Sequence, residues 1–434
     1  PVGTETSDDL GSVYDYADDD SFNWLDDFLA GTGDDWYADV PSETGGDFTM
    51  DDLDYGGDFH GKSGPIRVER APVEEWLPAQ QGFYEACRSL GYADCPDHNL
   101  PDSTGVGPLS FNLIDGVRIS TAIAYLPDAR HRLNLTIRAE TLVHRLVIED
   151  GRAVGVIAES GGDMFEVRAD QVIVSAGAVV SPQLLMLSGI GPADHLGEHG
   201  IEVVADVPGV GQNLQDHPMV FLVWNTVPEY EFRLDQKGTQ ISLRYTATDS
   251  PDRNDMIVYM NSSLSERTER GGKWDEPVGI STHVVINSAD SRGEIRLGST
   301  DISDQPIIDF NYMDAPRDLE RMRDGIRRMV EVGEQPAFSR NTIGLATPTA
   351  DIINDDDALN DWIRTEVTTG HHISCTNTMG VDSNPMAVVD QYGNVRGVDS
   401  LKVIDASIMP TCVRANINAT VIAMAERMAE LIVG

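Results

Sequence analysis

The segment that most restricts the possible folds of this chain is a short apolar run near its middle. Residues 171–177 read Gln-Val-Ile-Val-Ser-Ala-Gly, so apolar side chains stand next to one another and do not alternate with polar ones. Such a run is typical of a strand that is buried on both faces of a parallel sheet. Ser181 and Pro182 predict a helix that starts there, with Ser181 as the N-cap and Pro182 in the first turn. The pattern favours an α/β fold.

The length of the chain and its lack of long apolar stretches limit the rest of the architecture. A chain of 434 residues is too long for one simple core and suits two packed domains or one large α/β unit. No uninterrupted apolar stretch reaches about 18 residues, so we expect no transmembrane helix. The first residues lack a basic region followed by an apolar run, so no secretory signal is predicted.

The charge of the chain excludes some classes of partner. It has 72 acidic residues against 31 basic ones, and its formal net charge is −41. A surface of this charge repels nucleic acid and anionic membranes, so we expect neither as a partner. The four cysteines show no CxxC pair and no zinc-type spacing, which predicts no metal site and indicates a cytoplasmic, reducing compartment. These cysteines are Cys87, Cys95, Cys375 and Cys412.

The first part of the chain divides into an acidic zone and a globular zone. Residues 1–57 are crowded with acids, which is typical of a solvated, partly ordered leader, and a short helix is expected near 20–30. The apolar spacing over 74–92 predicts a helix. Turn residues then separate four β-branched segments, which predicts a β-meander. These segments are 134–138, 142–148, 154–157 and 165–168.

The second half alternates strand-like runs with one clear amphipathic helix, predicted over 317–333. The strand-like runs lie at 219–225, 256–260, 282–287 and 293–297. We interpret this part as an inserted antiparallel sheet supported by helices, a candidate substrate domain. A last buried strand at 401–407 and a terminal helix at about 418–433 complete the expected elements.

Residues 177–191 carry the most specific local pattern. Small residues at the end of a buried strand let a bulky planar ligand approach the backbone, and the amide-rich end of a helix points to the same region. Taken alone, the string fits an ordinary strand–turn–helix corner equally well. Over its whole length it resembles the second signature of the glucose-methanol-choline (GMC) oxidoreductases.

Other segments extend the resemblance over residues 58–434. They lie at 58–65, 118–121, 132–137, 208–218, 291–297 and 310–312. The resemblance implies an α/β (α+β) fold with two domains. An incomplete FAD-binding Rossmann-like domain, without its first βαβ unit, would comprise 58–215 and 371–434. A substrate domain built on an antiparallel sheet flanked by helices would comprise 216–370.

The C-terminal part carries the candidate catalytic residues. Oxidising an alcohol to a carbonyl needs a base for the hydroxyl proton, and histidine has a suitable pKa. The stretch 371–380 resembles the catalytic stretch of the family, and the register from Met379 and Gly380 assigns the base to His372. The adjacent His371 remains an alternative. The same register assigns the second catalytic position to Asn416, although Asn416 or Asn418 could simply cap the terminal helix.

The resemblance also implies a set of FAD-binding residues. Val143 occupies the position where the backbone meets adenine. Strand ends that approach the pyrophosphate and the flavin ring carry Ala176, Gly177, Asp405 and Ala406. At the start of the terminal helix, Asn418, Ala419 and Thr420 would lie at the pyrimidine ring, where a helix N-terminus stabilises negative charge.

One part of the family pattern is missing from the sequence. A flavoenzyme of this type should open with a buried strand and a GxGxxG turn, and neither is found here. Three explanations remain: the chain lacks a segment of the working protein, a second polypeptide supplies it, or the acidic leader fills the gap in a protein without flavin.

From the resemblance as a whole, we expect FAD-dependent oxidation of a small-molecule alcohol. The alternative is a flavin-free relative that uses the same pocket for proton transfer or for binding a ligand or partner.

Overall fold

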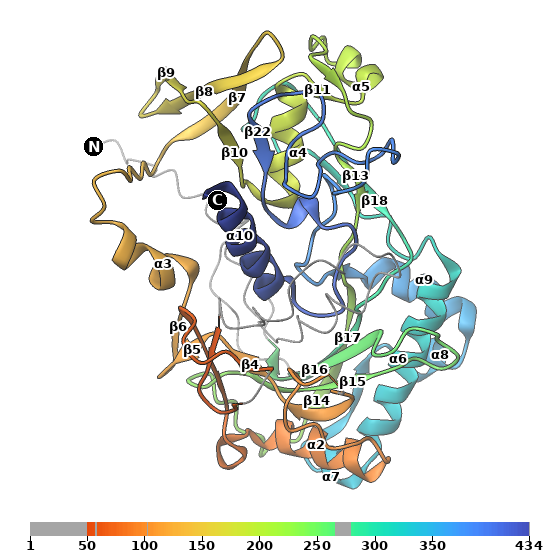
Figure 1. Cartoon of the computed structure of the whole chain (residues 1–434). Helices are drawn as coiled ribbons and strands as arrows, with labels where there is room; N and C mark the ends of the chain where they lie inside the picture. The colour runs from red at the N-terminus through yellow and green to blue at the C-terminus, as the bar shows by residue number, and fades with distance from the viewer. Residues whose placement is uncertain (1–49, 57–58, 102, 265–278, 434) are drawn as a thin grey trace, which may run out of the picture.

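The computed structural model describes residues 50–56, 59–101, 103–264 and 279–433. Within these ranges the chain forms two parts, each with its own apolar core (Figure 1). None of the described helices is long and apolar enough to cross a membrane. The helix expected near residues 20–30 lies outside the described ranges.

The larger part is a seven-stranded antiparallel sheet covered by helices on one face. Its order is β20-β14-β17-β16-β15-β3, and β21 also pairs with β14. The strands are β3 Gly105–Pro108, β14 Pro218–Thr226, β15 Thr239–Tyr245, β16 Met256–Leu264, β17 Gly279–Ile286, β20 Thr342–Thr347 and β21 Thr368–Thr369. The helices are α2 Pro78–Ser89, α6 Pro316–Gly333, α7 Pro336–Ser339, α8 Ala350–Ile353 and α9 Asp356–Glu366 (Figure 1).

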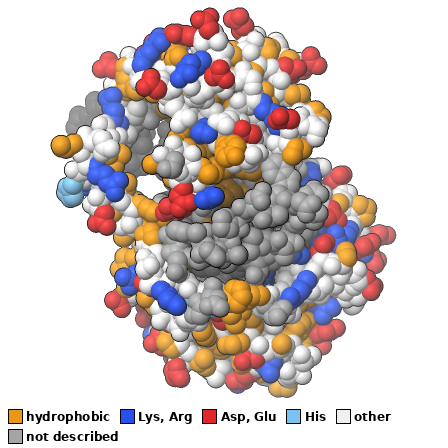
Figure 2. All heavy atoms as spheres, in the orientation of Figure 1, with side chains coloured by type: hydrophobic (Ala, Val, Ile, Leu, Met, Phe, Trp, Pro, Cys, Tyr) orange, Lys and Arg blue, Asp and Glu red, His pale blue; other side chains and the backbone are white. Residues whose placement is uncertain are grey.

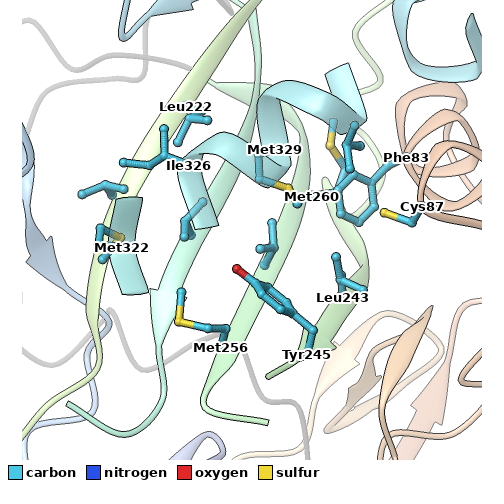
Figure 3. Close-up of a cluster of buried hydrophobic side chains, with 14 of the residues drawn as sticks. Phe83, Cys87, Leu222, Leu243, Tyr245, Met256, Met260, Met322, Ile326 and Met329 are labelled. Atoms are coloured by element: carbon cyan, nitrogen blue, oxygen red, sulfur yellow. The ribbon is translucent and has the colours of Figure 1, made fainter. Parts of the chain in front are cut away.

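Alternation along the strands divides the side chains between the two faces of this sheet. On β16, Met256 and Met260 pack with residues of α2 and α6 in the main core (Figure 3). The intervening Ile257 and Tyr259 belong to a smaller cluster on the opposite face. The helices lie on one face of the sheet. The opposite face carries Tyr259 and lies towards the second part of the molecule.

The second part is built around a short parallel pair of strands. β10 (Val172–Val174) pairs in parallel with β22 (Leu401–Val403), and α4 (Gly177–Leu187) follows β10 directly. The antiparallel meander β7-β8-β9 lies nearby (Figure 1). Its strands are β7 Leu142–Glu149, β8 Arg152–Ser160 and β9 Asp163–Arg168, and the last helix is α10 Ile417–Val433. The parallel pair and the antiparallel sheet confirm the predicted α/β (α+β) fold class.

Smaller elements complete the described fold. They are the strands β1 Met50–Asp52, β2 Ile66–Arg70, β4 Ser110–Phe111, β5 Leu113–Ile114, β6 Val117–Arg118, β11 Ile190–Gly191, β12 Ala205–Asp206, β13 Gln212–Leu214, β18 Gly293–Arg296 and β19 Ile307–Asp309, the helices α3 Thr121–Ala129 and α5 Ala193–Glu198, and the 3-10 turns η3 Val73–Glu75 and η4 Ala406–Ile408. β18 pairs with β13 and β19 in a separate small sheet, so the prediction that 293–297 belongs to the substrate sheet was wrong.

The start of α4 also differs from the prediction. The helix begins at Gly177, so Ser181 is not its N-cap and Pro182 lies inside it. Proline has no N–H to donate to the carbonyl four residues earlier. In its place, the hydroxyl of Thr376 donates to the Ala178 carbonyl at 2.6 Å. A residue from a distant part of the chain therefore provides the hydrogen bond that Pro182 cannot give to the Ala178 carbonyl.

Two further differences concern elements before residue 140. The predicted strand at 134–138 is not formed, and Leu135 and Ile137 are 39% and 53% exposed. Their alternation favours a half-buried strand, but no described strand runs beside them, and a strand needs a paired neighbour. In addition, α2 and β3 pack with the seven-stranded sheet although they lie in the range assigned to the cofactor domain.

Candidate active site

The ends of β10 and β22 bring four of the expected cofactor-binding residues together. The buried carboxylate of Asp405 accepts hydrogen bonds from the backbone N–H of Gly177 at 3.0 Å and from the hydroxyl of Ser181 at 2.5 Å. Ala176 precedes α4, and Ala406 begins the turn after Asp405. Two strand ends 228 residues apart in sequence are thus joined through one side chain.

Gly177 leaves open space at this strand end. Its φ is +79°, in the left-handed region that favours glycine, and a Cβ added to it would meet no atom within 4 Å. The described residues therefore leave room beside this backbone.

The other expected cofactor residues are more scattered. Val143 lies on β7 and packs against the same apolar cluster as Ala176. On the first turn of α10, Ala419 packs in a small core with residues of β1 and β2, and Asn418 is half-buried. Thr420 is buried, and its hydroxyl has no hydrogen-bond partner among the described residues.

The predicted base, His372, lies in the loop after β21 and meets a second histidine. Its Nδ1 is 3.0 Å from Nδ1 of His217, and the two ring centroids are 4.8 Å apart. No described residue forms a hydrogen bond with Nε2 of His372. The adjacent His371 is exposed and has a φ of +64°.

A single carboxylate holds the backbones of both histidines. Asp216 Oδ1 accepts hydrogen bonds from the N–H of His217 at 2.7 Å and from the N–H of His372 at 2.8 Å. Its Oδ2 accepts from the hydroxyls of Tyr312 and Thr369. Because Asp216 is buried and fully bonded, it fixes the start of β14 relative to the loop that carries His372.

Burial keeps both rings neutral near neutral pH. Desolvation lowers the pKa of His217, although the nearby Asp216 opposes this. Desolvation also lowers the pKa of His372, well below its ordinary value, and the neighbouring His217 and His371 add to the effect. A neutral imidazole is the form that can accept a proton.

Asn416 stands immediately before α10 and faces the open side of the large sheet. The hydroxyl of Tyr259 donates to its side-chain oxygen at 2.8 Å. The side-chain nitrogen of Asn416 can only donate hydrogen bonds. The preceding Arg414 is tethered to the same sheet, since its carbonyl accepts from Arg244 at 2.8 Å and from Asn287 at 3.3 Å. This segment and the His372 loop also meet through His217, whose Nε2 is 2.9 Å from the Val413 carbonyl.

The structure therefore adds His217, Asp216 and Tyr259 to the candidate site. The first two lie in 208–218, a segment that carried the family resemblance but received no role from the sequence. Tyr259 lies in a strand whose residues read as ordinary core, so no local pattern singled it out. No group of three or more metal-ligating side chains is found in the described ranges.

Comparisons with known proteins show the family to which the chain belongs. The GMC oxidoreductase family models match residues 16–219 and 289–425. An oxygen-dependent choline dehydrogenase from Photobacterium profundum is 36% identical over 399 residues, which cover 87% of this chain and 70% of that protein.

Solved structures show the same fold. Pyridoxine 4-oxidase from Mesorbium loti is 30% identical, with a TM-score of 0.85 over 95% of this chain and 81% of that chain. An FAD-dependent oxidoreductase from Chaetomium thermophilum is 20% identical, with a TM-score of 0.80 over 96% of this chain and 84% of that one. The chain belongs to the GMC oxidoreductase family, flavoenzymes that use FAD and act on CH–OH donors.

Proposed function

We propose that this chain oxidises the CH–OH group of a small-molecule alcohol to a carbonyl, with His372 as the base and Asn416 as the group that holds the substrate oxygen. The observation that carries the proposal is that His217 contacts both His372 and the segment just before Asn416. His372 is a neutral imidazole whose Nε2 meets no described partner, and Asn416 is an amide whose oxygen is occupied by Tyr259.

The described residues fit the flavin end of FAD. Open space adjoins Gly177, and two buried polar atoms, the Thr420 hydroxyl and the Asn377 side-chain oxygen, have no partner among the described residues. We propose that Gly177, Asp405 and Thr420 line this end, together with Ala176, Ala406, Asn418 and Ala419, and that Val143 lies towards adenine. When bound, FAD accepts the hydride from the carbon of the alcohol.

The two side chains would divide the work at the substrate oxygen. His372 Nε2 takes the hydroxyl proton, so that an O–H bond breaks and an N–H bond forms. An N–H of Asn416 donates to the same oxygen, and this bond strengthens as the oxygen gains negative charge. Because both groups lie in a partly buried site, little water competes for these bonds.

The test compares two adjacent histidines in the chain supplied with FAD. We expect His372→Asn to lower kcat by about 10²–10⁴-fold, the usual contribution of a general base. His371→Asn is the matched control: asparagine tolerates a positive φ, and His371 is exposed, so kcat should change less than about 3-fold. Choline and pyridoxine, named for the relatives above, are the first alcohols to assay.

Equal losses in the two variants would contradict the assignment of the base to His372. A visible absorption spectrum of the same sample addresses the flavin-free alternative, because bound oxidised flavin absorbs visible light. A chain that stays colourless with added FAD and oxidises no alcohol would overturn the proposed function.

A further inference from the structure

His217 is a buried histidine that no sequence pattern assigned to a role. It is 1% exposed and lies immediately before β14. Each of its ring nitrogens has a close partner: Nε2 is 2.9 Å from the Val413 carbonyl oxygen, and Nδ1 is 3.0 Å from Nδ1 of His372. These two contacts determine where the protons of both rings lie.

A carbonyl oxygen can only accept a hydrogen bond, so Nε2 of His217 must carry a proton. A neutral ring carries one proton, which leaves Nδ1 of His217 as an acceptor. Its partner, Nδ1 of His372, must then be the donor. With one proton on Nδ1, the neutral His372 has its lone pair on Nε2. The opposite arrangement would place two lone pairs against each other at 2.9 Å between His217 and Val413.

We propose that His217 is a positioning residue that fixes His372 in the tautomer with a protonated Nδ1, so that Nε2 is the atom that accepts the substrate proton. The inference rests on the proposed function and deepens it. When Nε2 takes the proton, Nδ1–H stays in its hydrogen bond to His217, and His217 itself gains and loses no proton.

The surroundings hold the backbones of both histidines in place. Asp216 holds both backbone N–H groups, and the N–H of Gly370 donates to the His217 carbonyl at 2.9 Å. A Cβ at Gly370 would lie 2.6 Å from that carbonyl oxygen and 3.4 Å from Nδ1 of His372, so this close approach requires glycine. The thiol of Cys412, 3.3 Å from Nε2 of His217, is a weaker and more distant partner than the Val413 carbonyl.

Two substitutions at His217 separate hydrogen bonding from proton relay. His217→Gln supplies one N–H donor and one oxygen acceptor but cannot pass a proton along, whereas His217→Leu supplies neither. We expect His217→Gln to keep kcat within about 10-fold of the wild type, and His217→Leu to lose about 10²-fold or more with a smaller change in KM. A loss in His217→Gln as large as in His217→Leu would show that His217 relays protons, and would overturn the proposal.

A second readout needs neither substrate nor FAD. Long-range ¹H–¹⁵N spectra of the histidine-labelled chain distinguish protonated from bare ring nitrogens, and the spectrum of His372→Asn identifies the signals of His372. We expect Nδ1 of His372 to be protonated and Nε2 bare in the wild type and in His217→Gln. A protonated Nε2 in the wild type would overturn the proposal even if His217→Leu does not fold. If the wild type oxidises no alcohol, the proposed function fails while the spectrum still decides the tautomer.

Discussion

At the scale of single residues, burial of histidines creates a dependence of stability on pH. His98 is 1% exposed, and its ring lies between the thiol of Cys95 and the hydroxyl of Ser242. Desolvation, with Arg244 nearby, lowers its pKa to about 4. His283 is kept neutral by the same cause, and its pKa is lowered to about 4. Such groups lower the stability of the fold once the unfolded chain, but not the folded chain, binds their proton.

We expect the free energy of unfolding to fall as the pH is lowered from about 6.5 towards 4. In this window the unfolded chain binds a proton at His98, whereas the folded chain does not, so acid favours unfolding. His98 alone should account for about 3 kcal/mol of this loss, because one pKa unit corresponds to about 1.36 kcal/mol. We expect His98→Gln to remove that contribution. Denaturant titrations at several pH values measure it. Parallel pH curves for the wild type and His98→Gln would contradict the expectation.

At the scale of elements, one glycine shows how packing overrides helix propensity. Gly333 is the last residue of α6, and a Cβ there would lie 2.1 Å from the ring of Trp224 on β14. That ring cannot easily move aside, since it packs edge-on against Phe338 with centroids 5.1 Å apart. The helix and the sheet therefore approach closely because this position has no side chain.

Gly333→Ala is expected to destabilise the protein by about 1–3 kcal/mol, the usual cost of overpacking. Alanine favours a helix by up to about 1 kcal/mol over glycine, so propensity alone predicts the opposite sign. Gly197→Ala in α5 is the matched control: a Cβ there meets no atom within 4 Å, so we expect a gain of up to about 1 kcal/mol. Thermal unfolding of the two variants measures both effects, and a stabilised Gly333→Ala would show that the interface yields.

At the scale of the whole molecule, the net charge of −41 opposes compaction. Asp and Glu side chains are spread over the surface of both parts on the face seen in Figure 2. This repulsion acts between exposed charges, and dissolved salt shortens its range. The Debye length falls from about 10 Å at 0.1 M salt to about 3 Å at 1 M.

We therefore expect NaCl to stabilise the folded chain, with a gain in unfolding free energy of about 1 kcal/mol or more between 0.1 and about 1 M. Thermal unfolding over a series of salt concentrations measures the gain. KCl should act like NaCl, because screening depends on ionic strength and not on the identity of the cation. A Tm that is unchanged or lower at high salt would show that repulsion is not a dominant cost.

The sequence singled out the candidate reacting groups but not their surroundings. Register from Met379 and Gly380 selected His372, and the structure places this histidine against His217. The predicted start of α4 at Ser181 was wrong because local preferences could not include Asp405, whose carboxylate binds both Gly177 and Ser181 from 224 or more residues away. Contacts between residues so far apart in the sequence cannot be predicted from the pattern of a short segment.

What the sequence determined by itself was the set of elements with strong local patterns. The apolar run of β10, the meander and the amphipathic α6 follow from side-chain periodicity, which depends only on near neighbours. The tertiary structure alone decided which donors and acceptors meet. Whether His372 offers a lone pair or a proton at Nε2 depends on His217 and on the Val413 carbonyl, 196 residues further along. The physical reason is that a hydrogen bond has a direction fixed by both partners, and here the partners are distant in sequence.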